Sequence, residues 1–264
     1  MGLWWAVMKR SFRRHATYRG ATLAGLFTNT IFGFIQAYVM LAIFSQRGDV
    51  GGFDRQDALT YVFVTQGFLM VINVFAGPGE ISARVRSGDI VTDFYRPVDF
   101  QAYSLALDLG RAMFQALARG VPPFLVGALV FDLVAPSSPA MVAAFLLAAV
   151  LATVASFGFR FLVGLAAFWI LDDRGPAQIL GVAWMFFSGF ILPINFFPGP
   201  LEAVARVLPF QVMLQVPVEI FLGKYTGAGL AGALALQVFW VVVLLGAGRV
   251  VLAAAMRKLV IQGG

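Results

Sequence analysis

Residues 77–100 read GPGEISARVRSGDIVTDFYRPVDF and separate two strongly apolar parts of the chain. The stretch mixes acidic and basic side chains, which are Glu80, Arg84, Arg86, Asp89, Asp93, Arg96 and Asp99. Pro78 is expected to end the helix before it. Because the sequence on both sides is apolar enough for lipid, we expect residues 77–100 to form a water-facing loop at one surface of a membrane.

The composition excludes a soluble protein. The 264-residue chain is 60% hydrophobic and only 12% charged, whereas soluble domains carry about 25% charged residues. A membrane-spanning helix needs about 20 apolar residues, so the length allows roughly six or seven spans and no separate soluble catalytic domain. The net charge of +6 fits loops that face anionic lipid better than it fits nucleic-acid binding. The chain has no cysteine, which excludes disulfides and thiolate chemistry.

We predict an all-α membrane protein with six transmembrane helices in one transmembrane domain, residues 1–264. The apolar runs place the spans at about 21–44, 59–75, 112–134, 140–171, 177–197 and 230–256. Arg111 marks the cytoplasmic end of the third span. Arg119, further into that span, is expected either to snorkel or to face the bundle interior.

Two other segments have their own patterns. Residues 1–19 place Trp5, Met8, Phe12 and Ala16 on one helical stripe, with basic residues on the opposite side. This pattern is typical of an amphipathic helix in the membrane interface, and a plain charged tail is the alternative. Residues 198–224 are apolar but interrupted by proline and glycine. We expect two short re-entrant helices there on the external side, at 201–207 and 211–221.

The distribution of positive charge predicts the orientation. Thirteen of the nineteen lysines and arginines fall in the N-terminal segment, the loop and its flank up to Arg111, and the ends that follow the fourth and sixth spans. Positively charged loops stay in the cytoplasm. We therefore expect a multi-pass protein of the inner (plasma) membrane with both termini and residues 77–100 in the cytoplasm.

The sequence offers no enzyme chemistry. Its only Gly-Lys pair, Gly223-Lys224, is followed by Tyr225, which does not fit the phosphate-binding motif G-x-x-x-x-G-K-[ST]. The single histidine, His15, stands in a basic segment and predicts neither a metal site nor a catalytic triad. We expect no catalytic residue, metal or cofactor in this chain.

Polar residues inside or beside the predicted spans are candidates for a transport pathway. They are Asn29, Gln36, Gln66, Asn73, Arg160, Asn195 and Gln237. The alternative for each amide is a hydrogen bond between helices, worth about 0.6 kcal/mol on average in membranes. Arg160 requires a partner because an unpaired arginine in a membrane is costly. Asp172 or Asp173 reaches it only if the helix bends, and a residue on another span or water at the cytoplasmic mouth are the alternatives.

The order of these segments resembles that of the ABC-2 type permeases, the membrane subunits of one class of ATP-binding-cassette exporters. In the charged loop Glu80, Gly88, Ile90 and Pro97 fit the family pattern, whereas Asp89 and Val91 depart from it. The form SGDIVTDFYRPVD is closer to a branch usually encoded with a second permease and one ATPase. A second pattern, Ser188-Gly189, Pro193, Pro198 and Leu208-Pro209-Phe210, resembles the fifth span and external helices of that family.

The resemblance implies a coupling helix between the second and third spans that docks on an ABC ATPase. The seven charged residues of the loop would then be the contacts, and ATP with Mg²⁺ would be bound by the ATPase. It also implies a dimer with a second copy or a homologous permease, surrounded by lipid, with no role for nucleic acid. Phe27, Phe32, Phe34, Phe186 and Phe187 favour a hydrophobic or amphipathic cargo, such as a drug, natural product or lipid. The alternatives are half of a secondary transporter, although no internal repeat is visible, or a membrane scaffold that transports nothing.

Overall fold

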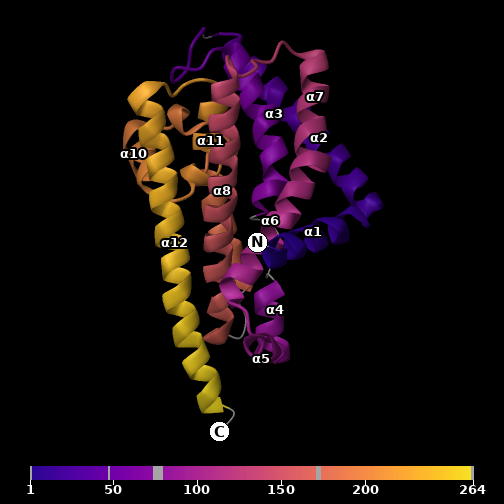
Figure 1. The fold of residues 1–264 in the computed structure, drawn as a ribbon. Helices are drawn as coiled ribbons and strands as arrows, with labels where there is room; N and C mark the ends of the chain where they lie inside the picture. Colours follow the sequence, from indigo (N-terminus) through magenta and orange to yellow (C-terminus); the bar gives the residue numbers. More distant parts are fainter. Residues whose placement is uncertain (1, 47, 74–79, 171–173, 263–264) are drawn as a thin grey trace.

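The computed structural model describes residues 2–46, 48–73, 80–170 and 174–262. Every named secondary-structure element in these ranges is a helix. The elements are α1 (Gly2–Ala16), α2 (Arg19–Phe44), α3 (Arg55–Ile72), α4 (Glu80–Ser87), α5 (Ile90–Phe94), α6 (Phe100–Gln115), η1 (Ala116–Gly120), α7 (Val121–Val130), α8 (Pro139–Leu165), η2 (Ala166–Phe168), α9 (Arg174–Phe187), η3 (Ile194–Phe196), α10 (Gly199–Val207), η4 (Gln211–Met213), α11 (Gln215–Phe221) and α12 (Gly227–Gln262). The long helices form an elongated bundle. Its one end carries α4, α5 and the end of α12, and its other end carries α10 and α11 (Figure 1). The predicted all-α class is confirmed for the described residues.

Within the described ranges, four helices are long and apolar enough to cross a bilayer. They are Arg19–Phe44, Phe100–Val130, Pro139–Phe168 and Gly227–Lys258, which correspond to the predicted first, third, fourth and sixth spans. The predicted second and fifth spans are occupied by α3 and by α9, whose apolar part is Ala177–Phe187. Length and composition therefore support four of the six predicted spans.

Helix α3 is the centre of the bundle, with most of its residues buried and with α2, α7 and α8 packed around it. A reciprocal cap starts it: Asp57 N–H donates to Asp54 Oδ1 (2.8 Å) and Asp54 N–H donates to Asp57 Oδ2 (3.1 Å). Asn73 ends it in the left-handed region, with φ 58°. Because α3 is enclosed by protein, it carries polar residues that a lipid-facing helix would not tolerate.

The third long helix begins earlier than predicted. It starts at Phe100, where Asp99 caps it by accepting from Ala102 N–H (2.7 Å), so the predicted start at Ala112 is wrong. The π-helical turn η1 lies in its middle, just before Pro122 and Pro123. Proline has no N–H and disrupts the regular hydrogen-bond ladder, and the wider turn lets the helix continue past both residues.

The predicted fifth span is also wrong at its end, because α9 stops at Phe187 and not at Phe197. Gly189 follows with φ +87°, and a Cβ there would lie 2.3 Å from Gln215 Oε1. From this turn the chain passes through η3, α10, η4 and α11. Helix α11 is fully buried, so the interrupted backbone is covered by protein. The two short helices expected at 201–207 and 211–221 are present as α10 and as η4 with α11.

The N-terminal segment forms the expected helix, and α1 runs across the bundle axis (Figure 1). It packs on α6, where Ser11 Oγ donates to Leu107 O (2.6 Å) and Phe12 meets Phe114 edge to face at 5.5 Å. The side of α1 that packs on α6 overlaps the predicted apolar stripe at Phe12. Val7 and Ser11 are buried, whereas Trp5 is 57% exposed and lies on the outer side.

Candidate functional site

The charged stretch folds into a helical hairpin, α4 and α5, joined at Gly88 with φ +80°. The described part of the stretch begins at Glu80, so Gly77 and Pro78 lie outside it. Figure 1 places the hairpin at the end of the bundle that also holds the end of α12. A mixed-charge stretch therefore forms a small structured unit, and it is not an irregular loop.

The hairpin is held to the bundle by an apolar cluster. Ile90 is fully buried against α8 and α12 residues, including Phe161, Leu165 and Leu252. A Cβ on Gly164 of α8 would lie 3.2 Å from Ile81 Cβ, so α4 sits directly on the α8 backbone. Burying an apolar side chain of this size stabilises by about 1.5–3 kcal/mol. A force on the hairpin would therefore reach α8 and α12.

The seven predicted contact residues divide into two groups. Asp93 is buried, and Arg84 Nη1 lies 2.6 Å from its Oδ2, so this pair braces α4 against α5. Asp99 is also engaged, because it caps α6 and pairs with Arg249 of α12. Burial raises the pKa of Asp99, but the hydrogen bonds from Arg249 and from the Ala102 and Gln101 backbone, together with the charge of Arg249, outweigh it, and the pKa lies below its usual value.

The remaining four residues are exposed on or beside the hairpin. They are Glu80, Arg86, Asp89 and Arg96. Two apolar residues that the sequence did not single out lie among them: Tyr95 is 84% exposed and Val91 is 38% exposed. An exposed aromatic flanked by charges is the composition of a protein-binding surface. We call Asp89, Val91, Tyr95 and Arg96 the hairpin tip.

A charge cluster lies at the C-terminal end of α3. Asp108 pairs with Arg111 (Nε to Oδ1, 2.8 Å) and with Arg160 (Nη2 to Oδ2, 2.6 Å). Arg111 also donates to Met70 O (2.6 Å) and Val71 O (2.7 Å) at the last turn of α3. The predicted partner of Arg160 on another span is thus Asp108, while Asp172 and Asp173 lie outside the described residues.

This cluster joins three helices. Ser156 Oγ of α8 donates to Ile72 O (2.7 Å), and Arg160 Nε reaches Ser156 Oγ at 3.4 Å. The last carbonyls of α3 are therefore satisfied by side chains from α6 and α8, and arginine at a helix C-terminus complements the helix dipole. The cluster therefore connects the C-terminal end of α3 to α6 and α8.

Three of the predicted pathway amides meet between α2 and α3. Asn29 Nδ2 donates to Gln66 O (3.3 Å), and Gln66 Nε2 donates to Gln36 Oε1 (2.9 Å). Asn73 caps α3 and does not join them. Gln237 donates to Ala148 O (3.1 Å) and Val212 O (2.8 Å), where it ties α12 to α8 and η4. These contacts fit helix-to-helix hydrogen bonds.

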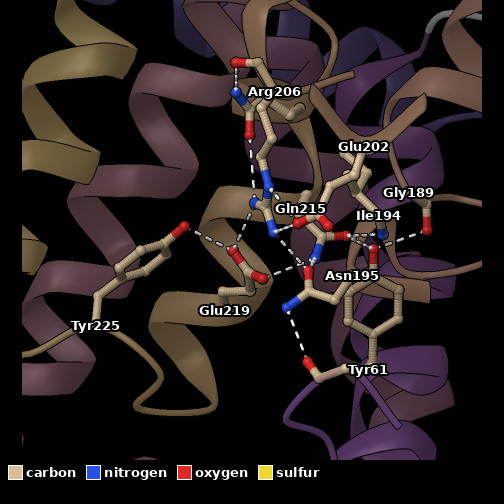
Figure 2. Close-up of polar contacts among 11 residues, drawn as sticks. Tyr61, Gly189, Ile194, Asn195, Glu202, Arg206, Gln215, Glu219 and Tyr225 are labelled. Carbon is tan, nitrogen blue, oxygen red and sulfur yellow. Dashed lines mark hydrogen bonds and ion pairs between the residues drawn. The ribbon is translucent and has the colours of Figure 1, made fainter. Parts of the chain in front are cut away.

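Asn195 belongs to a different group, the outer polar cluster, shown in Figure 2. Its Oδ1 accepts from Arg206 Nη2 (2.7 Å) and Gln215 Nε2 (2.9 Å), and its Nδ2 donates to Gly51 O (3.2 Å). Gln215 Oε1 accepts from Ile194 N–H (3.2 Å) and lies 2.5 Å from the Tyr61 hydroxyl. The cluster thus connects α3, η3, α10 and α11.

The buried acid of this cluster is Glu219, which is 2% exposed. It accepts from Gln215 Nε2 (2.9 Å) and the Tyr225 hydroxyl (2.8 Å), and Arg206 Nη1 lies 3.5 Å away. Burial, with a further contribution from the Glu219 carboxylate, raises the pKa of Tyr225, so its phenol remains a donor at neutral pH. The sequence reasoning missed Glu219, Arg206, Gln215 and Tyr61. The one available signal was an acid inside the apolar run 211–221.

The predicted aromatic lining is only partly on the surface. Phe27, Phe32 and Phe186 are 68%, 54% and 38% exposed, whereas Phe34 and Phe187 pack against the main core. The exposed face of α2 also includes Leu23, Ile35 and Tyr38. The apolar outer face that a lipid or a second subunit would cover therefore includes α2.

The comparisons with known proteins agree with this architecture. A family model described as ABC-2 family transporter protein matches residues 29–263. A comparison with the curated proteins found no match. Permeases of this family generally work with ABC ATPase subunits. The match covers nearly the whole described bundle, from α2 to the end of α12, and on this ground the chain belongs to the ABC-2 transporter family, as an integral membrane permease of an ABC transporter.

Proposed function

We propose that this permease exports a hydrophobic or amphipathic substrate, and that the α4–α5 hairpin is where an ABC ATPase docks. The observation that carries the proposal is the construction of the hairpin. Arg84 and Asp93 brace it internally at 2.6 Å, Ile90 anchors it, and Tyr95 projects from it at 84% exposure. Charged groups around an exposed aromatic fix docking register, and the aromatic supplies affinity.

The packing of the hairpin suggests how ATPase movement reaches the pathway. Closure of two ATPase subunits on ATP and Mg²⁺ would displace the hairpin as a rigid unit. Ile81 rests on Gly164 of α8, and Ile90 belongs to the same buried apolar cluster as Leu252 of α12. The hairpin joins the predicted second and third spans, and these would move with it. The contacts add α8 and α12, and the Asp108 cluster links α8 to α3 and α6.

The proposal also includes the orientation of the permease in the membrane and its pairing with a second permease. The hairpin and both termini face the cytoplasm of the inner membrane, because the positive charge is concentrated on those segments. A second permease, identical or homologous, would cover part of the apolar face that includes α2. Its aromatic surface, with Phe27 and Phe32 exposed, favours an apolar cargo over a sugar or an ion.

Charge reversal tests docking. In the permease–ATPase complex, Asp89→Arg combined with Tyr95→Ala should lower transport and permease-dependent ATPase activity at least about tenfold, since a hot-spot aromatic is worth about 2 kcal/mol or more. The matched control is Asp49→Arg, which reverses an exposed aspartate in the loop before α3. Asp93 is unsuitable for this purpose because it is buried. Unchanged coupled activity in the double variant would contradict the proposal.

A further inference from the structure

A basic cavity of about 280 Å³ lies at the elbow between α1 and α2, against the π turn of the third long helix. Arg14, His15 and Arg119 are among its lining residues, with Gln115 and Thr22, and no acidic side chain lines it. With liquid water at about 30 Å³ per molecule, the space equals roughly nine waters, which is enough for a phosphate group.

Arg119 is the unusual residue of this cavity. Its Nε is buried and has no hydrogen-bond partner within the described ranges, and no acid pairs with it there. By contrast, Arg111 of the same long helix and Arg160 of α8 share Asp108. A half-buried arginine without a counter-charge at a membrane surface is costly, and a bound anion would remove that cost.

The backbone around Arg119 is shaped to hold its guanidinium in the cavity. A Cβ on Gly25 of α2 would lie 1.9 Å from Arg119 Nη2, so the guanidinium rests directly on the glycine. Arg119 belongs to η1, and π turns within helices are frequent at functional sites. Gln115 Oε1 is also buried without a partner. The Gln115 oxygen is an acceptor and cannot bind an anion, so the unpartnered donor on this helix face is Arg119 Nε.

The remaining groups fit a membrane-facing anion site. Arg14 makes only an exposed contact to Glu80 (3.3 Å), with both side chains more than 60% exposed, so this pair is weak. His15 Nδ1 donates to Ser11 O (2.9 Å). The cavity opens beside α1, the helix whose pattern predicts a position in the membrane interface.

We infer that this cavity binds the phosphate of an anionic lipid headgroup, with Arg119 as its principal ligand and Arg14 as a second cation. Arginine binds phosphate through two parallel hydrogen bonds, and basic pockets between membrane helices accept such headgroups. The bound lipid would join the interfacial helix to the α2 and η1 segments.

Native mass spectrometry of the full-length protein in detergent tests this inference with dioctanoyl phosphatidylglycerol as the probe. Arg119→Gln should reduce retained lipid about tenfold, the effect of losing one charge-assisted phosphate contact. Gly25→Ala should also reduce it, because the new methyl group displaces the guanidinium while alanine still suits the helix. Arg13→Gln, an equal loss of charge at an exposed position of α1 outside the cavity, should leave retention unchanged.

Two further probes separate the sources of the phosphate group. Dioctanoyl phosphatidylcholine has the same phosphodiester but adds a choline cation, so it should be retained less than phosphatidylglycerol in a site lined by two arginines and no acid. Inorganic phosphate should displace the anionic lipid only at large excess. Displacement by equimolar phosphate would overturn the lipid assignment in favour of a free phosphate. Equal retention by the wild type, Arg119→Gln and Gly25→Ala would overturn the site itself. If Arg119→Gln does not fold, Gly25→Ala carries the same comparison.

Discussion

Arg84 Nη1 lies 2.6 Å from Asp93 Oδ2, and this ion pair closes α4 onto α5 across the turn at Gly88. Asp93 is buried, while Arg84 remains half-exposed. Arg96 approaches the same carboxylate at 3.6 Å. These ion pairs hold α4 and α5 together, so we expect the hairpin to move as one rigid unit when a partner displaces it.

Removing the charge of Asp93 should loosen the hairpin. Asp93→Asn should raise amide hydrogen exchange in α4 and α5 by about tenfold or more, because it removes the buried charge that pairs with Arg84 and Arg96. Asp89→Asn is the control, since Asp89 is exposed on the same unit. Equal exchange in both variants would show that the pair does not brace the hairpin.

The cluster of Asp108, Arg111 and Arg160 predicts an order of effects. Asp108→Asn leaves two buried arginines without a counter-charge and should destabilise by about 3–5 kcal/mol. Arg160→Gln should cost less, because Asp108 keeps its pair with Arg111. Denaturant unfolding in detergent measures both, with the exposed Asp132→Asn as a control. The reverse order would contradict the shared-carboxylate arrangement.

A close backbone contact fixes the position of α3 beside the third helix. A Cβ on Gly67 would lie 2.7 Å from Gly120 O, a backbone atom that has little room to move. Gly67→Ala should therefore destabilise by about 1–3 kcal/mol through overpacking. Gly232→Ala in α12, where nothing lies within 4 Å, should be neutral or slightly stabilising. Equal unfolding midpoints for the two variants would argue against the contact.

Tyr225 gives a prediction with a pH dependence. Tyr225→Phe removes a 2.8 Å hydrogen bond to Glu219 and should destabilise by about 1.5–3 kcal/mol at neutral pH. Burial raises the pKa of Tyr225 in the folded state above its unfolded value of about 10. The folded protein then holds this proton more tightly, so its contribution is fully present below about pH 10 and is lost as the pH rises further.

Unfolding free energies of the wild type and Tyr225→Phe, measured between neutral pH and pH 11, check this sign. The difference between the two proteins should shrink above about pH 10. A difference that stays constant or grows there would contradict the burial of the phenol beside Glu219.

Local patterns in the sequence were sufficient for the class and most of the helices. Apolar length predicted α2, α8 and α12, and the charged stretch predicted a separate inner unit. The start of the third helix was missed because Asp108 and Arg111 look unsuitable for a membrane helix. In the structure they neutralise each other and cap α3. The end of α9 depends on Gln215 and Tyr61 meeting Gly189, a contact between distant segments.

The candidate site was predictable in position but not in detail. Charge pattern located the hairpin, yet only the fold distinguishes the buried Asp93 from the exposed Asp89, four residues earlier. Tyr95 stands between Phe94 and Arg96, and nothing in the sequence shows that Tyr95 is exposed while Phe94 is partly buried. The outer polar cluster joins Tyr61 to Glu219 across a long stretch of sequence, and no local pattern indicates such a pairing.

Docking of the ATPase at the hairpin tip is tested most directly by single-cysteine cross-linking, which the absence of native cysteine makes clean. Tyr95→Cys and Asp49→Cys permeases would each be labelled with a short maleimide–benzophenone reagent, combined with the ATPase and illuminated, so that the cross-link needs no thiol on the ATPase. We predict that Tyr95→Cys cross-links to the ATPase and resists membrane-impermeant labelling of intact cells, while Asp49→Cys does the opposite. Labelling of Tyr95→Cys from outside the cell, with no cross-link to the ATPase, would contradict the account.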